Sequence, residues 1–435
     1  MKGVAQAQDL SGGAVALRNA NGTLALLTVI YVFNFIDRQI LNILAESIAK
    51  ELSLSDTQIG LMTGFAFAVF YTSMGIPLAR YADRPDSDRI TLMSICLAVW
   101  SAMTAACGLA QNFGQLLLAR IGVGAGEAGC TPAAISIIAD IYPKEKRSSA
   151  MGIYMMGVPI GSLFGLIVGG LMADAFGWRI ALLIVGLPGV VMALLLYFLV
   201  KDPRHNGVMS AARPPTLPWR EAIRELIASR AFTLLVIASS VNAFLAYGKG
   251  VWQIIFFMRS HGLSAGEVGL AVGLTVGTCG IIGSTVGGWL ADWFGTRNPA
   301  HYFIMPAVGF LVAIPFSIAA YSASDWRFAL ALMVVPAICG TLNYGPGMSV
   351  VQGIFRPQTR ATATAVKLFF QTLIGLGLGP LLFGFISDTL KPIAGPESVR
   401  WVLLGSTLLG IIPAVLLWVA GMSLPRELRH PDGHD

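Results

Sequence analysis

Long apolar segments are the feature that most constrains how this chain of 435 residues can fold. A helix needs about 20 predominantly apolar residues to cross a bilayer. Hydrophobic residues make up 55% of the chain and charged residues only 12%, against about 25% charged in an average soluble chain. This pattern predicts an all-α membrane protein with many spans. The twelve expected spans are residues 24–48, 57–82, 89–110, 113–141, 148–174, 179–200, 231–258, 265–291, 300–321, 327–355, 361–387 and 399–422.

The distribution of basic residues predicts the orientation of these spans. If both termini are cytoplasmic, the cytoplasmic tails and loops hold 19 of the 29 Lys and Arg residues, and the outer loops hold six. Because short loops rich in Lys and Arg stay on the cytoplasmic side, we expect the tails 1–23 and 423–435 to be cytoplasmic. The N-terminus lacks an apolar core of signal-peptide type, so no cleavage is expected. This placement explains the net charge of +6 without a nucleic-acid partner.

A long basic loop at residues 201–230 divides the chain into two six-helix halves, residues 24–200 and 231–422. The loop ends in WREAIRELI, which predicts a short amphipathic helix at the membrane interface. The halves form a repeat with an offset of about 213 residues. GIPLARYADR in the first half matches GGWLADWFGTR in the second, and YPKEKRSSAMG matches FRPQTRATATA. Two such halves predict a transport pathway on their pseudo-symmetry axis.

Two pairs of charged residues lie inside apolar segments: Asp37 and Arg38 in span one, and Arg120 and Glu127 in span four. A charge at the bilayer centre costs about 2.5–3.5 kcal/mol even on mild insertion scales, so it usually faces a partner or a water-filled path. Asp37 lies about 20 Å along its helix, and Glu127 reaches a similar depth. We interpret both carboxylates as proton-coupling groups, with Arg120 as a switchable partner. Two structural ion pairs between helices are the alternative.

Other polar residues of the spans predict an anionic substrate. Arg38 stays charged, and its planar fork suits a phosphate or a carboxylate. Lys367 and Gln371, an i,i+4 pair on span eleven, are candidates for a cavity wall that receives an anionic head group, and Asn34 is placed with Arg38. For Lys367 the alternative is a lysine that extends to the nearer membrane surface.

Charged residues also repeat at the cytoplasmic helix ends of the two halves. We expect them to form ion pairs and helix-end contacts that stabilise an outward-open state. The six expected gating residues are Asp83, Arg84, Arg147, Asp292, Arg297 and Arg360.

The repeat also relates two further carboxylates. Asp174 and Asp388 close spans five and eleven at corresponding positions.

The sequence contains no phosphate loop, no cluster with metal-ligand spacing and no nucleophile–base constellation. We therefore expect no cofactor, no metal and no enzymatic activity.

The spans, the central loop and the repeated G-x3-D-x2-G-x-R motif resemble the major facilitator superfamily. The second copy of the motif matches at Gly288, Asp292, Gly295 and Arg297, whereas Ala79 replaces the first glycine of the first copy. Within the superfamily, FNFIDRQI and RIGVGAGEAGC resemble the spinster group, whose animal members move lysophospholipids and sphingosine phosphate. The resemblance implies a proton-coupled transporter of an amphipathic anionic lipid that works by rocking of its two halves. It also implies a bacterial inner-membrane protein, and we expect a monomer.

Two alternative functions remain open at this point. One is a superfamily transporter of small organic anions or drugs. The other is an uncoupled lipid scramblase. Glycines at four-residue spacing from Gly157 to Gly169 resemble the antiporter motif of the superfamily. They would equally serve ordinary close helix packing, so they do not determine the direction of transport.

Overall fold

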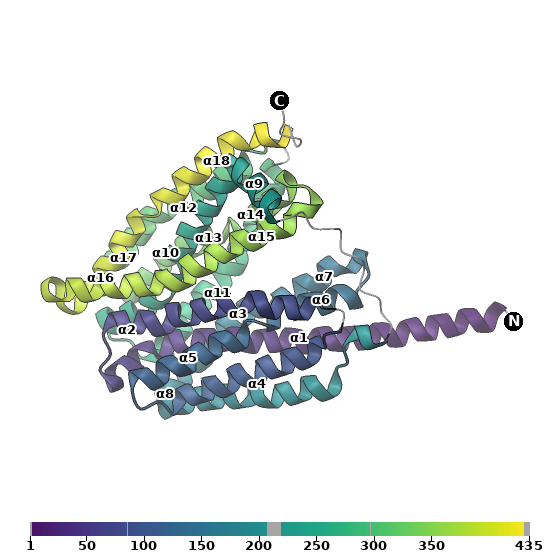
Figure 1. Cartoon of the computed structure of the whole chain (residues 1–435). Coiled ribbons are helices and arrows are strands. Elements are labelled where there is room, and N and C mark those ends of the chain that lie inside the picture. The colour runs from purple at the N-terminus through teal and green to yellow at the C-terminus, as the bar shows by residue number, and fades with distance from the viewer. Residues whose placement is uncertain (1, 85, 207–218, 296, 430–435) are drawn as a thin grey trace.

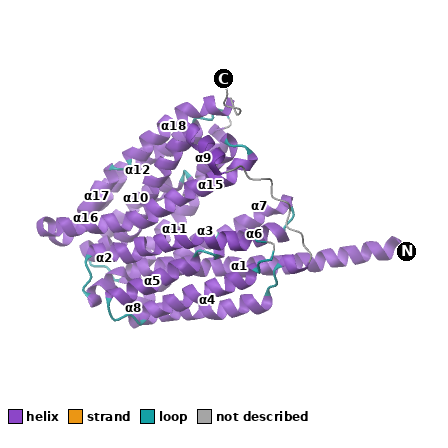
Figure 2. Ribbon diagram, viewed as in Figure 1, coloured by secondary structure: helices purple, strands orange, loops and turns teal. Residues whose placement is uncertain are grey.

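The computed structural model describes residues 2–84, 86–206, 219–295 and 297–429, and within these ranges it contains helices and no strands (Figure 2). Residues 207–218 of the expected linker and 430–435 of the expected tail lie outside the described residues. The α-helices are α1 Lys2–Leu52, α2 Asp56–Gly60, α3 Ala66–Asp83, α4 Arg89–Gly108, α5 Phe113–Glu127, α6 Cys130–Ile141, α7 Lys144–Met155, α8 Gly157–Leu199, α9 Trp219–Ala228, α10 Arg230–His261, α11 Ala265–Leu290, α12 His301–Ser322, α13 Trp326–Thr341, α14 Tyr344–Ile354, α15 Pro357–Phe370, α16 Gly379–Ala394, α17 Ser398–Leu408 and α18 Ile411–Arg429. Short π or 3-10 segments are η1 Leu61–Phe65, η2 Pro203–Asn206, η3 Ala291–Gly295, η4 Gln371–Leu378 and η5 Gly395–Glu397.

Nine helical segments of the described chain are long and apolar enough to cross a membrane, which makes this a multi-pass membrane protein. Two of them, Lys146–Leu199 and Gln358–Pro425, have 54 and 68 residues, enough for two crossings each at about 20 residues per crossing. Gly177, at φ 80°, breaks α8 where the fifth expected span gives way to the sixth. The shorter apolar helix Trp326–Thr341 lies where the tenth span is expected. Twelve crossings remain a prediction.

Three clusters of buried apolar side chains define how the two halves meet. One cluster, around Trp100, has its buried members in the first half, together with Ala20 just before it. Another, around Phe303, has its buried members in the second half, together with Leu226 of α9 and Leu424 of α18. The third spans both halves and includes Ile40 and Trp252. Its members on α10 lie between Leu245 and Met258, towards the end of this helix that is farther from the linker. At the linker end, α6 and α7 diverge from α14 and α15 (Figure 1). The halves are therefore joined at one end.

Close backbone approach joins the halves along two seams. In the α2–α16 seam, a Cβ added to Gly60 would collide with the carbonyl oxygen of Pro380. In the α8–α11 seam, a Cβ added to Gly170 would collide with the carbonyl oxygen of Ala265. Glycine permits this approach because it has no side chain. Both seams therefore depend on glycine for helix-to-helix contact across the halves.

A buried arginine organises the linker end of the first half. Arg89, at the start of α4, is fully buried and donates from Nε to Asp202 at 2.9 Å and from Nη1 to Asp140 at 2.6 Å. Burial acts to raise the pKa of Asp202, but hydrogen bonds from Arg89 and from the backbone of Arg204 outweigh it and hold that pKa below its usual 3.8. Because Asp202 follows α8 directly, this contact fixes the point at which the linker leaves the first half.

Candidate functional site

Helices α1 and α5 bring Arg38 and Glu127 together across 89 positions of sequence. The Nε–H of Arg38 donates to Oε2 of Glu127 at 2.7 Å. The side chain of Glu127 is fully buried, and that of Arg38 is 20% exposed. Oε1 of Glu127 is buried and has no hydrogen-bond partner among the described residues. Such a carboxylate, with one oxygen on an arginine and the other unsatisfied, is a place where a proton can bind.

Three aromatic rings surround the guanidinium of Arg38. Its central carbon lies 5.1 Å from the ring centroid of Phe35, 5.0 Å from Phe67 and 4.8 Å from Tyr71. Each contact is a cation–π interaction that holds the cation in place. Phe67 and Tyr71 were not among the residues expected in the site. Their i,i+4 spacing on one helix face was the available signal.

The side chain of Asp37 faces different residues from that of its neighbour Arg38. It is buried and faces Trp100 and Thr104 of α4. Adjacent residues of an α-helix point about 100° apart, so Asp37 and Arg38 face different neighbours. Asp37 and Glu127 are close enough to interact electrostatically, which places both expected proton-coupling carboxylates in one buried region.

Arg120 lies in the same buried region. Its Nε donates to the carbonyl oxygen of Met62 at 3.4 Å, and its guanidinium lies 5.4 Å from the ring centroid of Phe67. The described structure records no ion pair between Arg120 and a carboxylate. The expected pairing of Arg120 is thus not made in this conformation, and its role as a switchable partner stays a prediction.

The expected substrate-binding residues divide between the halves. Asn34 is buried one turn before Arg38. Lys367 of α15 is buried, and a Cβ added to Gly347 of α14 would lie 3.6 Å from its Nζ. Gln371 is the first residue of η4, a π-helical segment that packs on η1 of the first half. Asn34 therefore belongs to the Arg38 site, and Lys367 and Gln371 lie on the opposing half.

The expected gating residues show the repeat in their contacts. Arg147 donates from Nε to the carbonyl oxygen of Tyr142 at 2.9 Å, and Arg360 does the same to Phe355 at 2.9 Å. Both bonds lie within one half. These arginines thus stabilise corresponding turns, the one between α6 and α7 and the one between α14 and α15. They do so in a conformation in which the halves diverge at the linker end.

The remaining gating residues also lie at matching helix ends. Asp83 ends α3, and Asp292 lies in η3. The guanidinium of Arg84 lies 5.9 Å from the ring of Tyr81. That of Arg297 lies 5.3 Å from the ring centroid of Trp293. A gating role for this set stays a prediction.

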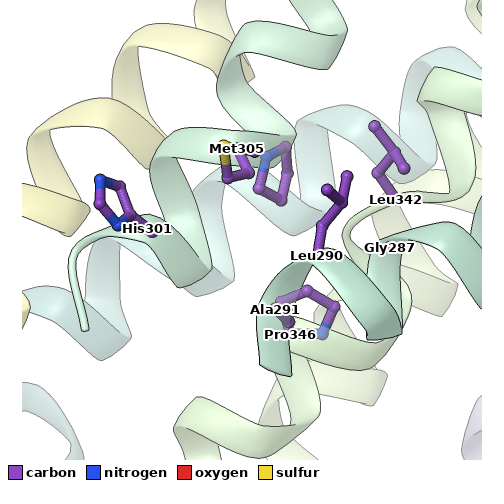
Figure 3. Close-up of a pocket in the computed structure, with 8 residues that line it drawn as sticks. Gly287, Leu290, Ala291, His301, Met305, Leu342 and Pro346 are labelled. Carbon is purple, nitrogen blue, oxygen red and sulfur yellow. The ribbon is translucent and has the colours of Figure 1, made fainter. Parts of the chain in front are cut away.

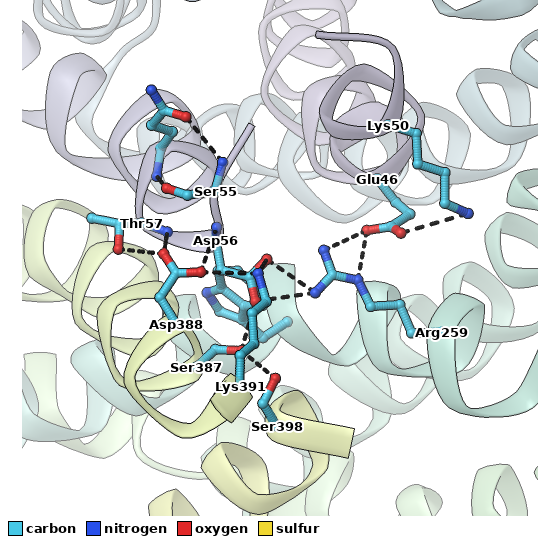
Figure 4. A network of polar contacts seen from close by, with 12 residues as sticks. Glu46, Lys50, Ser55, Asp56, Thr57, Arg259, Ser387, Asp388, Lys391 and Ser398 are labelled. Carbon is cyan, nitrogen blue, oxygen red and sulfur yellow. Dashed lines mark hydrogen bonds and ion pairs between the residues drawn. The ribbon is translucent and has the colours of Figure 1, made fainter. Parts of the chain in front are cut away.

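A second polar cluster, absent from the sequence-based expectations, joins the halves at the end opposite the linker (Figure 4). Asp56 is fully buried and accepts from Nη1 of Arg259 at 3.0 Å, from Nζ of Lys391 at 3.0 Å and from Oγ of Ser387 at 2.6 Å. Arg259 also pairs with Glu46 at 2.8 Å. Arg259 and Lys391 are two of the six basic residues expected in the outer loops. Asp56 lies more than 200 positions from both of them, beyond the reach of a local pattern.

Two hollows of the structure lie away from these residues. A cavity of about 10 Å³ between α11, α12 and α14 is lined by residues such as His301, Met305 and Leu342 (Figure 3). It has room for one water molecule at most. A broader apolar hollow of about 580 Å³ lies between Phe33 and the sixth expected span, around Pro188. Neither contains charged residues, so the buried charges of α1 and α5 remain the candidate site.

Most of the chain is similar to known membrane transporters. Residues 27–317 match the Major Facilitator Superfamily. An MFS-type efflux pump of Mycolicibacterium smegmatis is 32% identical over 413 residues, covering 94% of this chain and 95% of the relative. Protein spinster homolog 1 of Homo sapiens is 27% identical, covering 90% and 76%.

Solved structures extend this similarity to the fold. A bacterial homologue of the human lysosomal transporter spinster, in an inward-facing and unoccupied conformation, matches with a TM-score of 0.85 and 32% identity, covering 94% of this chain and 98% of the other. A D-xylose–proton symporter, 16% identical, matches with a TM-score of 0.69 and shares the fold alone. The predicted superfamily fold is thereby confirmed.

Proposed function

We propose that this chain, which belongs to the major facilitator superfamily and is spinster-like within it, couples protons to the transport of an amphipathic anionic lipid. Members of this family are transporters of small molecules and not enzymes. The proton and the lipid are the proposed parts of this function. They rest on the arrangement of Arg38 and Glu127.

The observation that carries the proposal is the 2.7 Å bond from Arg38 to the fully buried Glu127. While Glu127 is ionised, it occupies the guanidinium that an anionic head group would need. Protonation of Glu127 weakens that bond and leaves Arg38 free for the anion. Anion and proton therefore bind together, so anion binding takes up a proton.

The surroundings of Arg38 support an amphipathic substrate. Phe35, Phe67 and Tyr71 enclose the cation with apolar surface. A ligand with a charged head and an apolar tail would satisfy both kinds of contact. On the opposing half, Lys367 and Gln371 would contact the same ligand once the halves close around it.

The arrangement of the halves supports alternating access between the two membrane faces. The halves share a buried cluster at the end opposite the linker and diverge at the linker end. With both termini in the cytoplasm of a bacterial cell, this is an inward-facing state of an inner-membrane protein. We expect a monomer, because one chain contains both halves of the pathway.

Flux into proteoliposomes tests the proposal directly. The purified protein is reconstituted, and uptake of a fluorescent lysophospholipid is measured with and without a pH gradient. A gradient-dependent flux is expected. Equal flux in both conditions would point to an uncoupled scramblase and would refute proton coupling.

The relative named an efflux pump supports a second candidate, export of small organic molecules. In that case a set of organic anions and dyes would raise the melting temperature of the protein more than lysophospholipids do. A thermal-shift comparison of the two ligand sets separates the candidates, because a ligand stabilises the folded protein to which it binds.

A further inference from the structure

The start of α2 lies against a carboxylate of the other half. Asp388 of α16 accepts from the backbone N–H of Thr57 at 2.7 Å, from its Oγ1 at 2.7 Å and from the N–H of Asp56 at 3.1 Å. Ser55 already forms a capping box with Gln58. Asp388 thus satisfies first-turn amides that Ser55 cannot reach, and it does so from 331 positions away.

The start of α11 repeats this arrangement with the halves exchanged. Asp174 of α8 accepts from the N–H of Gly266 at 2.9 Å and from Oγ of Ser264 at 2.7 Å. Ser264 likewise forms a capping box, with Glu267. In both helices, therefore, a serine caps the third residue and an aspartate from the opposite half caps the second.

We propose that Asp174 and Asp388 are a symmetry-related pair of latches that stabilise closure of the end opposite the linker. Each latch is a carboxylate of one half bound to the first turn of a helix in the other half. The first amides of a helix lack partners within it and carry partial positive charge. When the halves separate at this end, both carboxylates lose their hydrogen bonds to the other half and bond to water instead. The latches therefore favour the closed state.

The two latches differ in strength for a physical reason. Asp388 is part-buried, accepts three hydrogen bonds from the opposite half and also pairs with Lys391 at 2.9 Å. Asp174 is exposed and accepts two. Because solvent weakens exposed charge interactions, Asp388 is the stronger latch. This inference rests on alternating access in the proposed function and does not depend on the substrate or on protons.

Spin-label distances test the latches. Gln111→Cys and Ser324→Cys label exposed loops of opposite halves at the joined end, and the native cysteines are buried. Loss of a helix cap costs about 1 kcal/mol, equivalent to about a fivefold change in an equilibrium. Asp388→Asn should raise the population with a longer distance by about fivefold or more, and Asp174→Asn by less. The double variant should combine both shifts.

Asp325→Asn is the matched control. Asp325 caps α13 at the same end but within its own half, where it accepts from the N–H of Arg327 at 3.1 Å. Among the described residues it accepts no recorded hydrogen bond from the other half. It should leave the distances unchanged. The proposal fails if neither latch variant nor the double variant alters the distances, or if Asp325→Asn alters them equally. Proton-independent flux together with shifted distances would instead refute only the proposed function.

Discussion

Arg38 bonds to Glu127, in another helix, and not to Asp37, its neighbour in sequence. The pairing places a guanidinium that faces three aromatic rings in contact with a fully buried carboxylate. It divides the two carboxylates by environment, since Asp37 faces α4 and Glu127 faces Arg38. The predictions for transport follow from this division.

Neutralising either buried carboxylate should remove proton coupling. Glu127→Gln keeps the size of the side chain but cannot exchange a proton, so we expect substrate flux that no longer responds to a pH gradient. Asp37→Asn should act in the same way. Glu221→Gln, at an exposed position of α9, is the control and should retain the response. Wild-type pH dependence in both carboxylate variants would make these residues structural.

Removing the guanidinium should weaken binding of an anionic ligand. A hydrogen bond to a charged group contributes about 1.5–3 kcal/mol, so Arg38→Ala should raise the dissociation constant about 10- to 100-fold. Arg38→Lys should rescue binding in part, because lysine keeps the charge but loses the planar fork. Isothermal titration with a lysophospholipid measures both. An unchanged constant for Arg38→Ala would exclude this residue from the binding site.

Asp292→Asn should favour the conformation seen here, if the expected cytoplasmic gate stabilises the outward-open state. A charge at a helix end contributes about 0.3–1 kcal/mol, so the equilibrium should change about two- to fivefold. Spin labels at Lys146→Cys and Arg356→Cys report the separation of the linker ends. Distances identical to those of the unsubstituted protein would contradict the gate assignment.

Acid should weaken the contact between Asp202 and Arg89. The pKa of Asp202 in the folded protein is below its usual 3.8, so this carboxylate stabilises the fold above that value. Its contribution is lost as the pH falls from 3.8 through the folded pKa. The melting temperature of the wild type should therefore fall more steeply below about pH 4 than that of Asp202→Asn. Parallel melting curves for the two proteins would contradict this linkage.

Labelling from outside the cell tests the orientation. Ser210→Cys lies in the basic loop, outside the described residues, where the distribution of Lys and Arg predicts a cytoplasmic position. An impermeant thiol reagent should leave it unmodified in intact cells and modify it after lysis. Modification in intact cells would reverse the predicted topology.

The sequence by itself determined the class of protein, the two repeated halves and the buried charges that form the candidate site. These features are local, because each depends on the length of an apolar segment or on a charge within it. The repeat also marked Asp174 and Asp388 as corresponding residues, although not what they contact.

Only the tertiary structure decided which residues interact. It paired Arg38 with Glu127 because neighbouring positions on α1 face different helices, and it left Arg120 on the carbonyl oxygen of Met62. It also placed Asp388 against the start of α2. Contacts of this kind depend on how one half packs on the other, and residues hundreds of positions apart carry no local signal of that packing.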